Sequence, residues 1–406
     1  MTGALSPASA QWTHRYPKVD GYSHHVYLEG YELPTLANGP TDPAPSPDGS
    51  SIAFAARGWI WTLDLDSGIA TRRTRGGEVD SRPAWAPDGR TIAFLRDDGS
   101  DLDIWSLDLA SGAETPLVES PAIELDPFYS AEGVFLYYSS AAAGDLDIWR
   151  LQVSTGESLR ITSDAGLEVR PLALPDDERL VYVAKGRGGP DRIVERSVSG
   201  EGGREILHQS IVSQSRPALS PDGRTLAVNW PAPDDYELWL ADLDNRDLIR
   251  LGARSGLPVA PAFSADGQWV YFVEADERQE FGLFRAARSG GAAEEVPVLA
   301  WDFGDETSWL RVVTEGAARL SVVDAAGHPL VAHGARPRFD GTHGRVFFYS
   351  PGVALLQAPA GSVRGSASQG FSSIATDLDV ELTAGETGEL RVELASIWDP
   401  RDDGWY

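Results

Sequence analysis

A motif made of a proline, a short apolar step and an Asp-Gly-like turn recurs six times in this chain. The copies begin at Pro43, Pro83, Pro127, Pro171, Pro217 and Pro261. They lie 40 to 46 residues apart, which is the length of one four-stranded propeller blade. Asp-Gly permits a tight hairpin turn, and the residues after it alternate with a period of two. The repeats therefore predict an all-β fold with a six-bladed β-propeller.

One aromatic residue stands at a nearly fixed place on the third predicted strand of every repeat except the fourth, which has Ile193 there. These aromatic residues are Trp61, Trp105, Trp149, Trp239 and Phe284. A ring of aromatic side chains is a possible ligand cage. We expect them to pack between blades instead, because a residue that recurs in each repeat normally serves the repeat.

The stretch of residues 25–36 alternates but carries no turn motif of its own. We expect it to close the ring as a strand of the blade that contains Pro261, because closure removes an exposed edge. After the repeats, alternating segments with Gly-rich turns predict a small β-sandwich of roughly seven strands. The expected plan is an N-terminal extension (1–24), the propeller (25–300), a linker (301–308), the sandwich (309–398) and a C-terminal tail (399–406).

Charge and cysteine content exclude several classes of function. The chain has 34 Lys and Arg against 61 Asp and Glu, a formal net charge of −27, which repels phosphate backbones and anionic lipids. We therefore expect neither a nucleic-acid nor a membrane partner. Cysteine is absent, which rules out disulfides, thiolate zinc sites and cysteine nucleophiles. The first residues lack a secretory signal pattern, so a cytoplasmic location is expected.

Two resemblances follow from these motifs. The six proline motifs and their LW or IW strands resemble the TolB-type propeller repeat. The opening GYSHHVYLEGYELP, with VVDAAGHPL, LQAPAG and WDPRDDGWY near the end, resembles the N-terminal half of PHP-type, carbaryl-hydrolase-like metallohydrolases. A more distant resemblance is to amidohydrolases with TolB-like propellers. In the PHP type a catalytic domain with a His-x-His metal motif follows, so the resemblance implies that this domain is absent from the present chain.

No cofactor is expected from the residues themselves. None of the seven histidines has the paired spacing, with carboxylates nearby, that would hold a hydrolytic metal. His24 and His25 are adjacent, so on a strand they point to opposite faces. The acidic runs DDGSDLD from Asp97 and PDDYE from Pro233 offer oxygen ligands for calcium, but both lack the Gly and Glu of an EF-hand loop. Calcium is the alternative that these runs leave open.

The candidate site is the central channel. The first strand of each blade is innermost, so the residue before each repeat proline is expected in a ring around the axis. The ring residues are Asp42, Arg82, Asp126, Arg170, Arg216 and Ala260. The adjacent layer, three residues before the prolines, is formed by Asp80, Glu124 and Glu168.

Two interpretations of the ring are open. Arg and Asp of neighbouring blades pair and pin the blades together, or the three arginines bind a small anionic molecule or an acidic partner segment. For the whole chain we expect a non-catalytic recognition or scaffold module that binds a partner protein or gates substrate for a metal-dependent hydrolase domain. The alternative is a stand-alone hydrolase, lyase or isomerase that uses the channel as its pocket. A His-x-His segment in the following reading frame would favour the module.

Overall fold

The computed structural model describes residues 35–185, 191–199, 202–208, 216–231, 236–245, 247–252, 257–276, 280–340, 345–370 and 373–398. Every regular element in these ranges is a β-strand, so the all-β class is confirmed. Among these residues, no helix is long and apolar enough to cross a membrane.

A turn that begins with serine and ends with Asp-Gly fixes the hairpin of the first, fifth and sixth repeats. The Ser46 hydroxyl donates to Asp48 at 2.6 Å and accepts the Ser51 N–H at 3.0 Å, while Gly49 adopts a φ of 72°. The same bonds form around Ser220 and Ser264 in later repeats. The turn is therefore fixed by contacts within six residues of sequence.

Six sheets, antiparallel except for the fifth strand of the first, follow one another along the chain, consistent with propeller blades, and we number them blades 1 to 6. Blade 1 contains β1 (Thr41–Pro45), β2 (Ser51–Ala56), β3 (Trp59–Asp64), β4 (Ile69–Arg72) and β25 (Ala300–Asp302). Blade 2 contains β5 (Val79–Trp85), β6 (Thr91–Asp97), β7 (Leu102–Asp108) and β8 (Glu114–Val118). Blade 3 contains β9 (Glu124–Tyr129), β10 (Phe135–Ser140), β11 (Asp147–Gln152) and β12 (Glu157–Arg160).

The other three blades have four strands each. Blade 4 contains β13 (Leu167–Ala173), β14 (Arg179–Lys185), β15 (Asp191–Ser197) and β16 (Arg204–His208). Blade 5 contains β17 (Ala218–Leu219), β18 (Thr225–Pro231), β19 (Tyr236–Asp242) and β20 (Leu248–Arg250). Blade 6 contains β21 (Leu257–Phe263), β22 (Trp269–Ala275), β23 (Phe281–Ala287) and β24 (Glu294–Glu295).

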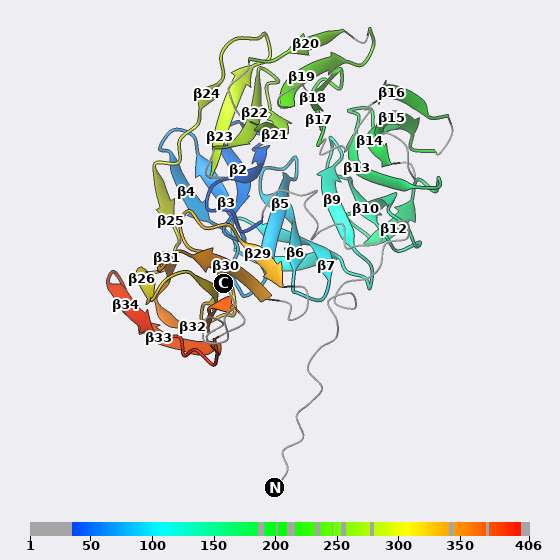
Figure 1. The fold of residues 1–406 in the computed structure, drawn as a ribbon. Coiled ribbons are helices and arrows are strands. Elements are labelled where there is room, and N and C mark those ends of the chain that lie inside the picture. The colour runs from blue at the N-terminus through cyan, green and yellow to red at the C-terminus, as the bar shows by residue number, and fades with distance from the viewer. Residues whose placement is uncertain are drawn as a thin grey trace.

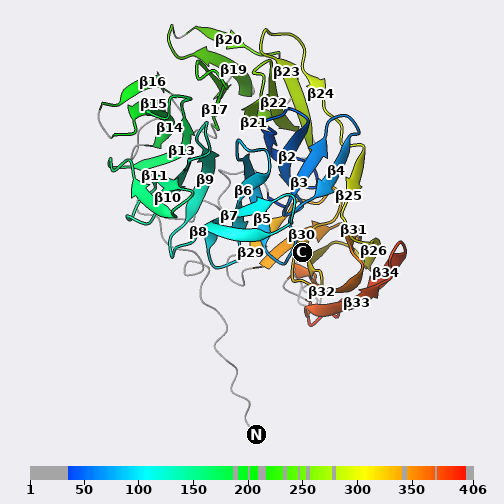
Figure 2. The same cartoon turned by 180° about the vertical axis from the view of Figure 1, so that it is seen from behind.

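The blades are arranged in a ring, which Figures 1 and 2 show from opposite sides. The first strands β1, β5, β9 and β13 contact one another in that order, and β21 contacts both β1 and β17. The five repeat aromatics belong to the apolar clusters of the blades or pack against them. Their role is therefore packing, as the fixed position in the repeat predicts.

Strands reach into both ends of the range predicted as a linker, residues 301–308: β25 lies at its start and β26 (Thr307–Thr314) begins near its end. Ala300–Asp302 pairs in parallel with β4 and becomes the outermost strand of blade 1. The strand forms because β4 offers an unpaired edge and because the Trp301 ring packs edge-on against Trp61 at 4.8 Å. The ring-closing strand predicted for residues 25–36 lies outside the described residues, except for positions 35 and 36, which form a turn.

Two further sheets form a C-terminal unit beside blade 1 (Figure 1). The smaller sheet contains β31 (Val353–Pro359), β26 (Thr307–Thr314) and β34 (Thr387–Val392). The larger contains β29 (Arg338–Asp340), β30 (Arg345–Ser350), β27 (Ala318–Val323), β32 (Gly361–Ser368) and β33 (Thr376–Leu382), with β28 (Pro329–Leu330) paired to β27. Alternate residues of β26 and β27 are buried, so both sheets contribute to one apolar core.

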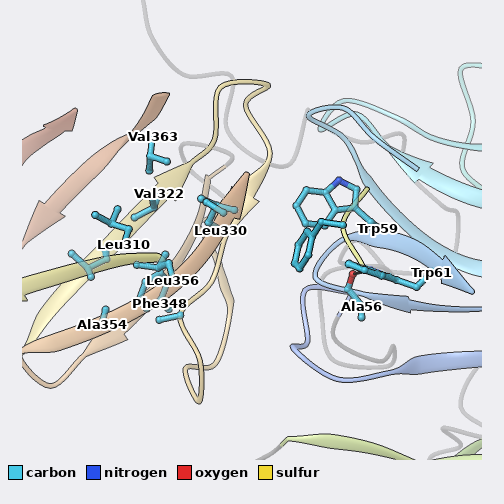
Figure 3. Close-up of a cluster of buried hydrophobic side chains, with 14 of the residues drawn as sticks. Ala56, Trp59, Trp61, Leu310, Val322, Leu330, Phe348, Ala354, Leu356 and Val363 are labelled. Atoms are coloured by element: carbon cyan, nitrogen blue, oxygen red, sulfur yellow. Dashed lines mark hydrogen bonds between the residues drawn. The ribbon is translucent and has the colours of Figure 1, made fainter. Parts of the chain in front are cut away.

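The core of the C-terminal unit continues into blade 1. Figure 3 shows Leu330 and Trp59 on opposite sides of this junction. His328 is fully buried there; its ring stacks on Trp59 at 3.8 Å, and its two nitrogens lie 2.8 Å from the carbonyl oxygens of Arg57 and Glu78. A Cβ on Gly58, which has a φ of 79°, would lie 2.7 Å from this ring. The two units are thus packed as one body.

Candidate functional site

The residue before the repeat proline lies at a β-bulge of the first strand. Strand pairing shifts register there in β1, β5, β9, β13 and β21. The backbone is left-handed, with φ of 51° at Asp42, 49° at Arg82, 56° at Asp126, 59° at Arg170 and 50° at Ala260. Proline cannot donate to the ladder, so a bulge accommodates it. This conformation costs on the order of 1 kcal/mol per non-glycine residue, so surrounding contacts must hold it.

Asp126 is the hydrogen-bonding centre of the ring. Arg82 of blade 2 forms an ion pair with this carboxylate of blade 3, and the two side chains are 8% and 12% exposed. The Ser139 hydroxyl and the backbone N–H of Arg170 both donate to the second oxygen of Asp126 at 3.2 Å. One carboxylate therefore connects blades 2, 3 and 4.

A second ion pair joins blades that are not neighbours. Arg216 of blade 5 pairs with Asp42 of blade 1, and their side chains are 14% and 8% exposed. Blade 6 lies between them and places Ala260 at the ring position, where the short methyl side chain does not separate the two charges. Loss of either partner would leave an uncompensated buried charge.

Four of the six ring residues are therefore engaged in ion pairs between blades. This geometry matches the interpretation in which arginine and aspartate pin the blades together. Anion binding by Arg82, Arg170 and Arg216 stays a prediction. Burial raises the pKa of the Asp191 carboxyl. The positive charge of nearby Arg170 opposes this rise.

Asp80, in the layer next to the ring, is held by its own blade. Its carboxylate accepts two hydrogen bonds from Arg96 at 2.8 and 2.9 Å, and Arg96 also donates to Glu114 at 2.6 Å. Burial raises the pKa of Asp80 to about 6, although Arg96 favours its ionised form.

Glu124 occupies the same repeat position in blade 3 but has no arginine. The hydroxyls of Ser120 and Ser140 donate to it at 2.7 and 2.9 Å. Burial, together with the neighbouring Asp103 carboxyl of blade 2, raises the pKa of Glu124 to about 9. Glu124 therefore keeps its proton at neutral pH and can donate it to the Asp103 carboxylate across the blade boundary.

Glu168 repeats this arrangement between blades 3 and 4. Burial, followed by the charge of Asp147, raises the pKa of Glu168 to about 8. Asp147 is fully buried and forms an ion pair with Arg160 at 2.7 Å. Two successive blade boundaries thus contain a protonated glutamate beside an aspartate.

Sequence reasoning missed Asp103 and Asp147. Both precede an Ile-Trp pair on the third strand of their blade, and each faces the acid three residues before the next repeat proline. The signal in the sequence was the aspartate that recurs directly before the Ile-Trp pair in these two repeats. Protonated buried acids occur in active sites, but Glu124 and Glu168 are only 1% and 3% exposed and are not accessible to a substrate.

No group of three His, Asp or Glu side chains within the described ranges is placed to hold a metal ion. In the acidic run that begins at Asp97, the carboxylates stabilise a turn. Asp98 accepts the backbone N–H of Ser100 at 2.7 Å, and Asp97 accepts that of Gly99 at 2.7 Å. The first residues of the run from Pro233 lie outside the described residues, so calcium binding there stays a prediction.

The sheets, their order around a ring and the repeated bulge define a β-propeller domain. Residues 20–216 match the sequence model of the TolB β-propeller domain. This chain therefore contains a TolB-like propeller domain.

Solved structures with a similar fold include TolB of Acinetobacter baumannii, which is 20% identical over 55% of this chain and 56% of its own, with a TM-score of 0.49. A putative TolB of Agrobacterium tumefaciens is 19% identical over 60% of this chain and 88% of its own, with a TM-score of 0.48. An oligogalacturonate lyase in complex with manganese is 15% identical over 61% of this chain and 76% of its own, with a TM-score of 0.46. The matched part of this chain thus spans little more than half of the A. baumannii protein.

Proposed function

We propose that this protein is a non-catalytic recognition and scaffold module. In this proposal a closed six-bladed propeller and a β-sandwich together hold a partner protein, such as a PHP-type metal-dependent hydrolase domain. The observation that carries it is the junction, where buried His328 and a continuous apolar core fix the C-terminal unit on blade 1. A scaffold must keep its parts in a fixed orientation, and this packing supplies one. The sequence resemblance to the N-terminal half of such hydrolases supports the same proposal.

The proposed partner surface is on the C-terminal unit. Ile374 and Ile397 are 55% and 62% exposed. They lie close together because Ser373 pairs with Ser396 and the Ile374 N–H donates to the carbonyl of Ala395 at 3.1 Å. Adjacent exposed apolar side chains are typical of protein contact sites.

Binding is tested by titrating the purified chain with a separately produced PHP-type hydrolase domain in a calorimeter. Ile374→Ser combined with Ile397→Ser should weaken binding strongly. The matched control is Leu248→Ser combined with Ile249→Ser, because these residues are 47% and 53% exposed on β20 of blade 5. Equal affinity for both double variants would contradict the proposed surface.

The non-catalytic part of the proposal is tested separately. The isolated chain is assayed with zinc, manganese and iron against ester, carbamate and phosphodiester substrates. We expect no metal-dependent turnover. Activity that survives repurification and disappears with a chelator would refute this part.

A further inference from the structure

A small pocket lies at the junction between blade 1 and the C-terminal unit. Its polar lining residues are Asn38, Arg57 and Trp59 on the propeller side and His333 and Gln357 on the other. The cavity volume is about 10 Å³, which is close to the space of one water molecule. No acidic residue lines this pocket, although the chain carries a net charge of −27.

Arg57 is fixed in the pocket by its backbone and by its side chain. It lies in the β2–β3 turn with a left-handed φ of 53°, and its N–H donates to the carbonyl of Ala37 at 2.7 Å. The guanidinium lies 4.8 Å from the centre of the Trp301 ring, and Nη1 donates to Gln357 at 2.9 Å. The orientation of the cation is therefore determined before any ligand arrives.

Two donors of this pocket have no acceptor. Arg57 Nε is buried without a hydrogen-bond partner, and so is Nε1 of Trp59, a residue that is 2% exposed. Burial lowers the pKa of Arg57 to about 10, and no carboxylate in the described part of the chain opposes this shift. Buried Arg72, Arg82 and Arg96 each have an acidic partner. A buried guanidinium N–H and a buried indole N–H without acceptors indicate a missing acceptor, and the positive charge of half-buried Arg57 favours an anion there.

We propose that the junction pocket binds a carboxylate group through Arg57 and Trp59. The free side of the guanidinium carries two parallel N–H groups, a geometry that fits a planar carboxylate. The enclosed space is that of about one water molecule, so only one carboxylate oxygen would enter it, and the rest of the head group would lie at the open side of the pocket. The rest of the ligand would leave the pocket past His333, which is exposed. The carboxylate belongs either to a small organic acid or to the C-terminus of a peptide.

The experiment is an NMR titration of the intact protein with sodium acetate, in which acetate replaces chloride at constant ionic strength. The Trp59 indole N–H signal is the reporter and is assigned by its loss in Trp59→Phe, a variant that keeps a ring against His328. We expect a saturable shift of this signal. Arg57→Gln should weaken binding about tenfold or more, because it removes a charge-assisted hydrogen bond. Arg391→Gln, on the exposed edge of β34, should leave the titration unchanged.

Two further arms complete the test. Two short peptides that differ only in a free or an amidated C-terminus distinguish the ligand sources. If acetate and the peptide with the free C-terminus both shift the signal, the ligand is a peptide terminus. If acetate alone shifts it, the ligand is a small acid. If Arg57→Gln does not fold, the melting temperature is measured instead, and acetate should raise it in the parent but not in Trp59→Phe. An unmoved Trp59 signal in the parent, or an equal response to sulfate, would overturn the proposal. This site is separate from Ile374 and Ile397, so either proposal can fail alone.

Discussion

The protonated glutamates between blades predict an unusual dependence of stability on pH. Glu124 and Glu168 keep a proton in the folded protein because they are buried, next to Asp103 and Asp147 respectively. We consider the substitutions Glu124→Gln and Glu168→Gln. Glutamine has the shape of the protonated acid but cannot release a proton, so it fixes the hydrogen bonding of the neutral form.

The magnitude follows from the two pKa values. Glu168 and Glu124 have folded pKa values of about 8 and about 9, whereas an unfolded glutamate has a pKa near 4.3. At a pH between the unfolded and the folded pKa of a glutamate, the folded state holds a proton that the unfolded state has released. The free energy of unfolding therefore falls as pH rises. Each group contributes a slope of up to about 1.4 kcal/mol per pH unit. This stability is complete below the unfolded pKa and is lost as pH rises through the folded pKa.

The assay is urea denaturation of the parent and the variants from pH 5 to pH 8. Each glutamine variant should become more stable relative to the parent by up to about 1.4 kcal/mol for every unit of increasing pH. Exposed Glu157 on β12 provides the control, since Glu157→Gln should show no such trend. The same pH dependence in the parent and in both variants would refute the assignment of a proton to Glu124 and Glu168.

Three further predictions concern contacts between distant segments, each measured as the free energy of unfolding. Arg216→Gln should lower the free energy of unfolding by about 3 kcal/mol, because buried Asp42 loses its partner. This loss should be smaller in a protein that already carries Asp42→Asn. Equal losses with and without Asp42→Asn would contradict the ion pair. His328→Phe keeps the stacked ring but removes its N–H donor, so it should cost about 1 to 3 kcal/mol; an unchanged stability would exclude His328 from the junction. Trp301→Ala should cost about 3 to 5 kcal/mol and should promote self-association through the uncovered edge of β4; a stable, monomeric variant would contradict the role of β25.

Much of the propeller was predictable because its determinants are local. The Ser-Pro-Asp-Gly turn is held by bonds within six residues, as around Ser46 and Asp48. Alternation with a period of two then places one face of each strand inside a blade. The ring position could also be identified, because the proline after Asp42, Arg82 or Asp126 marks the bulge that recurs in five of the six first strands.

The partners within the ring were not predictable. Sequence indicates that arginine and aspartate share one layer, but Arg216 reaches Asp42 past blade 6 only because the ring curves and Ala260 is short. The pairs of Glu124 with Asp103 and of Glu168 with Asp147 depend likewise on how neighbouring blades meet.

The hairpins, the repeat length and the all-β class depend on bonds between residues close along the chain, so they are predictable from sequence. Tertiary structure alone decided that β25 covers blade 1, that His328 bonds to a carbonyl 271 positions away, and that Arg57 and Gln357 meet in one pocket. Such contacts follow from the packing of whole units, which places residues together without any local pattern to mark them.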